Sequence, residues 1–186
     1  MNHADHVALV RGGVAGAAGR WLELGAGEGA FTLALAELLG PGGEIAAVDR
    51  DQRALARAVT IVGATHPGVS LQASVADFTR ELPERPPGGF DGVLAANSLH
   101  FVRDRQAVLA AIRGVLRPAG RLVVVEYDAD GGNPWVPFPF SFETWRREAI
   151  AAGFGEPRLR HRVPSRFLGA IYAASCTSDT SPDPVG

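Results

Sequence analysis

The sequence predicts an α/β protein in which helices cover a mostly parallel β-sheet. Short apolar runs alternate with amphipathic stretches along the chain, as in repeated strand–helix units. The run at residues 122–125 is unbroken and apolar, which is typical of a strand buried on both faces of a parallel sheet. A length of 186 residues is ordinary for one domain, so we expect a single domain over residues 1–176.

Gly and Pro separate the expected elements in the first half of the chain. An N-terminal helix is expected at residues 3–11, and we interpret residues 1–13 as a lid over the ligand site, with plain packing as the alternative. The elements that follow are a strand at 20–24, a helix at 30–39, a strand at 44–48, a helix at 52–62 and a strand at 69–73. Residues 81–89 contain three prolines and two glycines and are therefore expected to form a loop.

The second half continues the same alternation. The expected elements are a strand at 90–96, a helix at 103–116, a strand at 120–127, an irregular loop at 128–140 and a helix at 143–152. Ser141 is a candidate N-cap for the last helix, and Gly153 is placed to end it.

Two final strands, at residues 158–163 and 167–174, are expected to form an antiparallel hairpin at the sheet edge. Three basic residues alternate along the first of them and are expected on one face, where charge prevents edge-to-edge pairing: Arg158, Arg160 and Arg162. From Thr177 onward the Ser, Asp and Pro content predicts a disordered tail, residues 177–186.

Composition excludes several classes of protein. A net charge of -2 gives no overall attraction to nucleic acid or to anionic membranes, and no apolar run reaches the roughly 18 residues of a membrane helix. All 18 basic residues are Arg, so a lysine Schiff base and a lysine-containing phosphate loop are excluded. One cysteine and a start without a secretory pattern predict a cytoplasmic protein. No metal site is predicted, because His3, Asp5 and His6 lie together on a terminus that frays.

The most informative stretch is residues 21–31, WLELGAGEGAF, where an expected strand runs into a glycine-rich turn and a helix. Such a turn brings backbone N–H groups and a helix N-terminus close to a ligand. Asp49 lies 24 residues after Gly25, at the end of the second expected strand, where a carboxylate can accept both hydroxyls of a ribose. This spacing indicates an adenosine-containing ligand.

Two ligands fit the turn at this point, because Gly25-x-Gly27-x-x-Ala30 also matches the dinucleotide fingerprint. Glu23 favours S-adenosylmethionine, since a carboxylate attracts an amino-acid ammonium and repels a pyrophosphate. Gly29 changes the pattern to GxGxG. After the third expected strand, Asp77 offers an acceptor for an adenine amino group, although the same side chain could merely cap the following turn.

With these motifs the sequence resembles the class I S-adenosylmethionine-dependent methyltransferases over about residues 20–174. The resemblance extends to the segment Asn97-Ser98-Leu99-His100-Phe101 and to the turn at residues 116–120, where Ala119 stands in place of the family's usual Gly. It implies a Rossmann-like three-layer sandwich with a seven-stranded, mostly parallel sheet and a reversed last strand. The cofactor residues that it implies are Glu23, Gly25, Ala26, Gly27, Gly29, Asp49, Arg50, Asp77, Phe78 and Asn97.

The expected reaction is direct in-line transfer of a methyl group to a small-molecule nucleophile. His100 is the candidate general base, because histidine can take a proton from a hydroxyl or an amine near neutral pH; a hydrogen-bonded structural histidine is the alternative. Tyr127 and Trp135 are candidate substrate-binding residues, in an aromatic segment with Phe138 and Phe140 that could instead cover the core.

Two other functions stay open at this stage. A non-catalytic S-adenosylmethionine-binding module would keep the cofactor motifs without an open substrate pocket. A nicotinamide oxidoreductase shares the glycine turn, but the chain has no Tyr-x-x-x-Lys pair. The residues themselves identify neither the methyl acceptor nor the oligomeric state.

Overall fold

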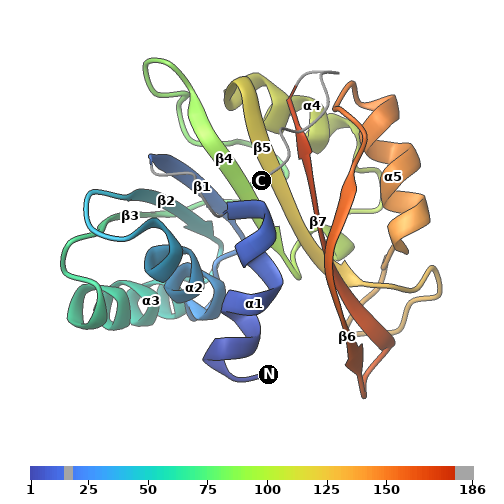
Figure 1. Ribbon diagram of the computed structural model, residues 1–186, viewed down its shortest axis with the longest axis horizontal. Coiled ribbons are helices and arrows are strands. Elements are labelled where there is room, and N and C mark those ends of the chain that lie inside the picture. Colours follow the sequence, from blue (N-terminus) through green and yellow to red (C-terminus); the bar gives the residue numbers. More distant parts are fainter. Residues whose placement is uncertain (15–18, 179–186) are drawn as a thin grey trace.

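The computed structural model describes residues 1–14 and 19–178 (Figure 1). The first half contains α1 (His3–Val14), β1 (Arg20–Leu24), α2 (Ala30–Leu39), β2 (Glu44–Asp49), α3 (Gln52–Thr65) and β3 (Ser70–Val75). The second half contains β4 (Phe90–Ala96), the 3-10 turn η1 (Leu99–Phe101), α4 (Gln106–Val115), β5 (Leu116–Tyr127), α5 (Phe142–Ala151), β6 (Arg158–Ser165) and β7 (Gly169–Thr177). The alternation predicted from the sequence is confirmed.

The seven strands of the described residues lie in one sheet with the order β3-β2-β1-β4-β5-β7-β6. Strands β1 to β5 pair in parallel, whereas β7 is antiparallel to both β5 and β6. This confirms the mostly parallel sheet with a reversed last strand. The strand order changes direction between β1 and β4, and ligands of open α/β sheets bind at such a point, beyond the carboxyl ends of the strands.

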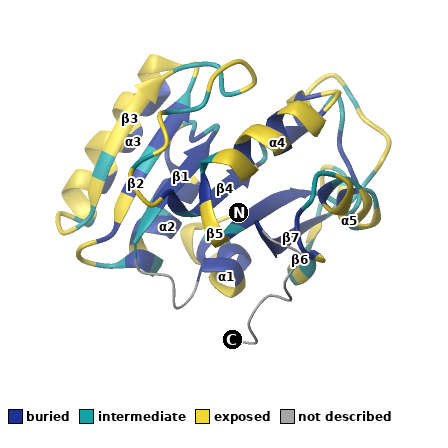
Figure 2. Ribbon diagram, turned by 90° about the horizontal axis from the view of Figure 1, so that it is seen from above, coloured by how far each residue is buried: buried dark blue, intermediate teal, exposed yellow. Residues whose placement is uncertain are grey.

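Helices cover both faces of the sheet, so the molecule has three layers (Figure 2). Helices α1, α2 and α3 pack on one face around Trp21, Leu35 and Val123. Helices α4 and α5 pack on the other around Leu109 and Trp145. In Figure 2 the central strands β1 and β4 are largely dark blue, as expected for strands covered on both sides, whereas β3 at the sheet edge is largely yellow.

Several boundaries differ from the prediction by a few residues, and those of β5 and β7 have a clear structural reason. Strand β5 begins at Leu116, because the turn with Pro118 is part of the strand rather than a break before it. At the other end, Thr177 still pairs in β7, and Ser178 is buried with its backbone N–H donating to the carbonyl of Gly120 at 2.8 Å. Thr177 and Ser178 therefore do not belong to a disordered tail, and the rest of that prediction, residues 179–186, lies outside the described part of the chain.

The three alternating arginines of β6 do not share one face, contrary to the prediction. A register shift between Leu159 and His161 inserts an extra residue at Arg160. Arg160 lies against Gly12 of α1, with its Nε donating to Ser175 at 2.7 Å. Arg162 pairs across from Tyr172 and contacts Asp128 at 2.8 Å. The bulge reverses the alternation, and a sequence pattern cannot reveal a bulge that tertiary pairing imposes.

Replacing Ala119 by Gly is expected to stabilise the protein by about 0.5–1 kcal/mol. Ala119 has a backbone φ of +57°, in the left-handed region that disfavours residues with a Cβ. Glycine removes this strain, although the greater freedom of the unfolded chain offsets part of the gain. Chemical denaturation of both proteins measures the difference, and unchanged or lower stability of the variant would show that Ala119 is not strained.

Candidate active site

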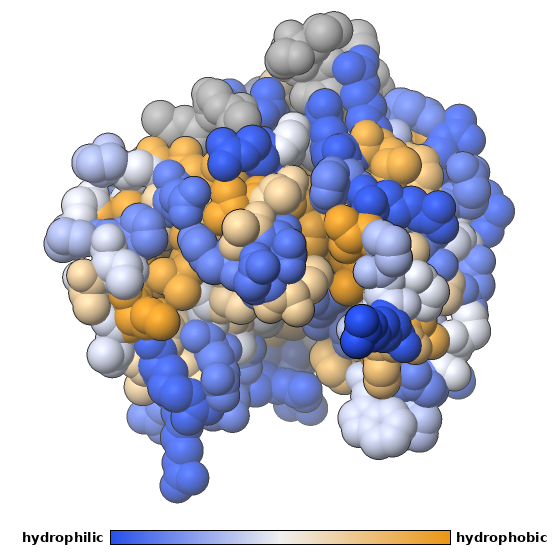
Figure 3. All heavy atoms as spheres, turned by 60° about the horizontal axis from the view of Figure 1, so that its bottom comes forward, coloured by the Kyte–Doolittle hydropathy of each residue, from blue (hydrophilic) through white to orange (hydrophobic). Residues whose placement is uncertain are grey.

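Two adjoining cavities open at the carboxyl ends of the central strands, on the side of the molecule that Figure 3 turns toward the viewer. The glycine-loop cavity has a volume of about 280 Å³ and is lined by Gly25, Gly27, Asp49, Arg50, Phe78, Asn97, Ser98 and Phe101. The aromatic cavity has a volume of about 450 Å³ and is lined by Asn97, His100, Phe101, Tyr127, Trp135, Val136 and Phe167. Asn97 and Phe101 line both, so the two cavities meet at the segment that follows β4.

The glycine loop between β1 and α2 is shaped by close contacts. A Cβ on Gly25 would lie 2.6 Å from the Cβ of Ser98, and one on Gly29 would lie 2.7 Å from that of Ala58. Both residues also have positive φ, at +75° and +91°. Gly27 differs, because the space beyond its Cα is open, and there the backbone faces the cavity. The loop is thus packed from behind and open toward a ligand.

Asp49 connects the second strand to this loop. Its carboxylate accepts hydrogen bonds from the backbone N–H of Gly27 and from that of Asp51, each at 2.8 Å. Asp49 also lines the glycine-loop cavity, so its carboxylate holds the loop and faces the ligand space. The sequence placed it correctly at the end of β2.

Several buried polar atoms near the loop have no hydrogen-bond partner among the described residues. These include Glu23 Oε2, Asn97 Oδ1 and Ser98 Oγ. Burial raises the pKa of Glu23 from 4.5 to about 8, and the charge of Asp49 acts in the same direction. The unpartnered acceptor oxygens of Glu23 and Asn97 suit an ammonium group, which carries three donors, better than a phosphate, which carries acceptor oxygens of its own. The arrangement therefore fits the amino-acid end of S-adenosylmethionine.

The other predicted cofactor residues divide into two groups. Arg50 and Phe78 line the glycine-loop cavity, as predicted. Asp77 does not line it: its Oδ1 accepts hydrogen bonds from the backbone N–H and the hydroxyl of Thr79, at 3.0 and 2.6 Å, which hold the pKa of Asp77 below its usual value. Ala26 is buried in the core beside the loop. In this structure Asp77 thus caps the following turn.

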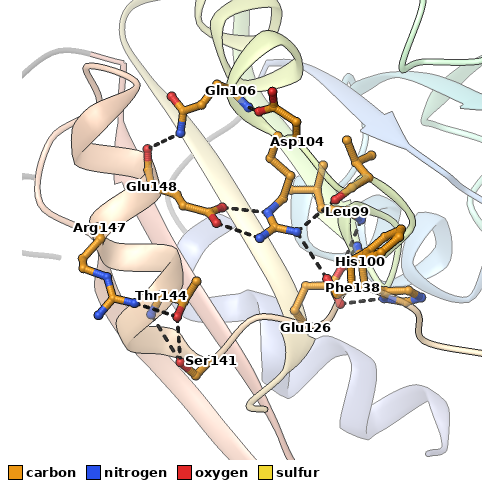
Figure 4. Close-up of polar contacts among 12 residues, drawn as sticks. Leu99, His100, Asp104, Gln106, Glu126, Phe138, Ser141, Thr144, Arg147 and Glu148 are labelled. Carbon is orange, nitrogen blue, oxygen red and sulfur yellow. Dashed lines mark hydrogen bonds and ion pairs between the residues drawn. The ribbon is translucent and has the colours of Figure 1, made fainter. Parts of the chain in front are cut away.

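His100 forms a buried pair with Glu126 (Figure 4). The Nδ1 of His100 lies 2.7 Å from Glu126 Oε2, while Glu126 Oε1 accepts the backbone N–H groups of Leu99 and His100 at 3.0 and 3.2 Å. Neither side chain is more than 4% exposed. Because Glu126 contacts Nδ1, Nε2 is the ring nitrogen that remains for another partner, and His100 lines the aromatic cavity.

Sequence reasoning missed Glu126. The available signal was an acidic residue at the end of an otherwise apolar strand, the same signal that singled out Glu23 and Asp49. What the sequence could not provide is the pairing of β4 with β5, which sets Glu126 beside the segment that follows β4.

Arg105 anchors the segment that carries His100 through contacts with Glu148 and Phe138. Its guanidinium contacts both carboxylate oxygens of Glu148 on α5 at 2.7 Å and donates to the carbonyls of Val102 and Phe138. The N–H of Phe138 in turn donates to the carbonyl of His100 at 3.0 Å. A bidentate, buried guanidinium is a rigid support, so the loop before α5 is fixed against the His100 segment.

The aromatic cavity brings together side chains from distant segments. The ring centroid of Phe167 lies 5.7 Å from that of Tyr127 and 6.4 Å from that of Trp135. Tyr127 and Trp135 were expected here, whereas Phe101 and Phe167 were not. Phe140 is fully buried between Trp145 and Tyr172, so it covers the core. The aromatic segment therefore lines a cavity with Trp135 and covers the core with Phe140, and the binding of a substrate there stays a prediction.

Helix α1 packs along the sheet face beside α2 and against β5, β6 and β7. At its N-terminal end the ring of His6 lies 4.7 Å from that of Phe31, at the start of α2. Neither cavity is lined by α1 in the structure, and its action as a lid stays a prediction. In the part of the chain that the structure describes, no helix is long and apolar enough to cross a bilayer.

Comparison with known proteins gives consistent matches. A family model described as a methyltransferase domain matches residues 22–122. The ubiquinone/menaquinone biosynthesis C-methyltransferase UbiE of Pasteurella multocida is 32% identical over 112 residues, covering 57% of this chain and 39% of that protein. An uncharacterized methyltransferase of Mycobacterium tuberculosis, Rv0089, is 34% identical over 106 residues, covering 57% and 49%. The chain thus spans less than half the length of these two relatives.

Solved structures with similar folds extend over most of the chain. The N-methyltransferase NodS of Bradyrhizobium japonicum superimposes with a TM-score of 0.72 at 20% identity and covers 95% of both chains. The cyclase SpnF superimposes with a TM-score of 0.74 at 18% identity, covering 96% of this chain and 82% of that one. At these identities the likeness establishes the fold.

Proposed function

The chain belongs to the S-adenosylmethionine-dependent methyltransferases, and we propose that it transfers a methyl group to a small-molecule nucleophile by direct in-line displacement. The observation that carries this proposal is the pair of cavities that meet at Asn97 and Phe101. One has the glycine loop and the carboxylate expected for the cofactor, and the other is open space beside it for an acceptor. Reactants held in adjoining sites need no covalent enzyme intermediate, since positioning itself lowers the barrier.

The cofactor would be held by residues of the glycine-loop cavity. Glu23 and Asn97 would accept hydrogen bonds from its ammonium group, Asp49 would accept from the ribose hydroxyls, and Asp77 with Phe78 would contact the adenine. When bound, S-adenosylmethionine supplies the methyl group on a positively charged sulfur. The chain's own part is to orient the acceptor atom and to remove its proton.

His100 is the residue proposed to take that proton. It lines the aromatic cavity, and Glu126 holds its Nδ1. A carboxylate in this position fixes the imidazole tautomer, orients the ring and stabilises the imidazolium that forms. Glu126 acts through His100 and is therefore a positioning residue.

Two alternative functions, a non-catalytic binding module and a nicotinamide oxidoreductase, are disfavoured by specific observations. The fold is shared by a cyclase, so the fold alone does not require methyl transfer. A non-catalytic binding module would need no second cavity, and the aromatic cavity beside the glycine loop favours an enzyme. A nicotinamide oxidoreductase is disfavoured by Glu23, because an ammonium favours the ionised form of this buried carboxyl whereas a pyrophosphate opposes it.

S-adenosylhomocysteine is expected to raise the melting temperature, whereas NADH is expected to leave it unchanged. At a ligand concentration of about 100 times Kd, binding adds roughly 2.7 kcal/mol to the free energy of unfolding. A thermal denaturation series with each ligand measures this. Stabilisation by NADH and none by S-adenosylhomocysteine would sink the proposal.

Replacing Asp49 by Ala is expected to weaken S-adenosylhomocysteine binding by roughly 1–3 kcal/mol, because the ribose hydroxyls and the N–H of Gly27 lose their acceptor. Asp51→Ala is the matched control. The Asp51 carboxylate accepts the N–H groups of Arg53 and Ala54 and caps α3, so its loss should lower stability but not affinity. Calorimetric titration of both variants decides the matter, and equal affinities would remove Asp49 from the ribose site.

A further inference from the structure

We propose that the aromatic cavity binds an uncharged aromatic compound with a hydroxyl group, and that this hydroxyl oxygen accepts the methyl group. The inference rests on the proposed function and adds the class of acceptor. It starts from the lining of the cavity. Four of its side chains are aromatic, namely Phe101, Tyr127, Trp135 and Phe167. No carboxylate or guanidinium of the described residues lines it, and the imidazole of His100 is the lining side chain that can accept a proton from a hydroxyl.

Several of these aromatic rings are exposed to solvent, and a bound flat ligand would bury them. Trp135 is 72% exposed, Phe101 53% and Phe167 49%. These rings come from three separate segments and converge on a space of about 450 Å³, within the size range of small-molecule sites. Aromatic rings gain from offset or edge contacts with another ring in addition to the apolar surface that they bury. A planar aromatic ligand matches this arrangement better than an extended polar one.

Charge argues for a neutral acceptor. The bound cofactor would bring one positive charge to the boundary with this cavity, and an apolar wall does not screen it. An alkylammonium acceptor would be repelled, since the lining offers no carboxylate to compensate. A permanent anion would lose its hydration in the cavity, and no cation of the described lining residues would compensate for that loss. A neutral hydroxyl avoids both costs, and the anion it forms in the reaction is attracted to the sulfonium.

The His100–Glu126 pair supplies the proton acceptor for this step. As the acceptor O–H proton passes to Nε2 of His100, an oxygen lone pair forms the new O–CH₃ bond. The S–CH₃ bond breaks, its electron pair stays on sulfur, and S-adenosylhomocysteine leaves; His100 then releases its proton to water. An aromatic hydroxyl, with a pKa near about 10, gives up its proton to an imidazole far more readily than an aliphatic one.

The test uses three probes that share one ring system and differ in charge: 2-naphthol, 2-naphthoate and protonated 2-(aminomethyl)naphthalene. Each is titrated calorimetrically into the full chain saturated with S-adenosylhomocysteine. We expect 2-naphthol to bind at least about tenfold more tightly than either charged probe. Trp135→Ala and Phe167→Ala should each weaken it by about three- to tenfold. Ile61→Ala removes an exposed apolar side chain of α3 that lines neither cavity, and it should change nothing.

The outcomes separate this inference from the function on which it rests. Equal or tighter binding of a charged probe would overturn the proposed acceptor class, and tighter binding of the cation would point to amine acceptors. Failure of 2-naphthol to bind a chain that does bind S-adenosylhomocysteine would overturn the inference and leave the cofactor assignment intact. Failure to bind S-adenosylhomocysteine would contradict the proposed function itself.

Discussion

Replacing His100 by Ala is expected to lower turnover by about 100-fold or more, with the affinity for S-adenosylhomocysteine nearly unchanged. The physical reason is the loss of the imidazole that lines the aromatic cavity and is held at Nδ1 by Glu126. Steady-state kinetics with an accepted substrate measure the effect. His161→Ala is the control, because His161 is an exposed histidine of β6 that lines neither cavity. A higher KM with unchanged kcat would mean that His100 orients the acceptor instead.

The Glu126→Gln substitution tests whether Glu126 positions the His100 imidazole for proton transfer or only supports the local fold. The amide oxygen can still accept the backbone N–H groups of Leu99 and His100, but the amide nitrogen would face Nδ1 and favour the tautomer that carries its proton on Nε2. The variant should fold, lose turnover about as strongly as His100→Ala, and lose the acidic limb of the pH profile of kcat. Glu126→Asp should recover part of the activity. A folded Gln variant with normal turnover would reduce Glu126 to a structural role.

The free energy of unfolding is expected to fall as the pH rises from about 4.5 to about 8, through the buried carboxyl of Glu23. Its pKa is about 8 in the folded chain and 4.5 as the reference value, so the folded state binds the extra proton in this range. The stability that the protonated Glu23 carboxyl contributes is fully present below pH 4.5 and is lost as the pH rises through about 8. A difference of this size between the folded and reference pKa values corresponds to about 5 kcal/mol in the free energy of unfolding. Glu23→Gln should remove this pH dependence and be more stable than the native chain above pH 8.

The same carboxyl links protonation to cofactor binding. An ammonium beside Glu23 favours the ionised form, so binding at pH 7 should release a proton and affinity should rise with pH toward 8. Calorimetric titration of S-adenosylhomocysteine in buffers with different ionisation enthalpies counts the released protons. Proton release that is the same in Glu23→Gln would show that the ammonium does not bind there.

Local signals were sufficient for the residues around the glycine-loop cavity. Gly25, Asp49 and Asn97 each follow the carboxyl end of an expected parallel strand, so their position at one edge of the sheet could be predicted from the chain alone. The aromatic cavity could not be predicted in this way, because it depends on how distant segments pack. Phe167 reaches the cavity through the β6–β7 hairpin, and Glu126 reaches His100 only through the register of β4 with β5. Tertiary pairing, rather than propensity, decides these positions.

Backbone context explains the remaining differences. Pro118 is a strong helix breaker, and the sequence placed the break before the strand, whereas β5 includes the turn. The Arg160 bulge changes which face each arginine occupies, and no residue type in β6 marks it. Asp77 caps its own turn in the structure, as the alternative considered for it states, and its contact with adenine stays a prediction.

Transfer of an isotopic label tests the central claim most directly. S-adenosylmethionine carrying a ¹³C-methyl group is incubated with the full chain and neutral aromatic hydroxyl compounds, beginning with 2-naphthol, and the products are followed by NMR. The account predicts a new O–¹³CH₃ signal that forms with the native chain and about 100-fold more slowly with His100→Ala. Retention of the label on sulfur across the whole series, in a chain that binds S-adenosylhomocysteine, would contradict it.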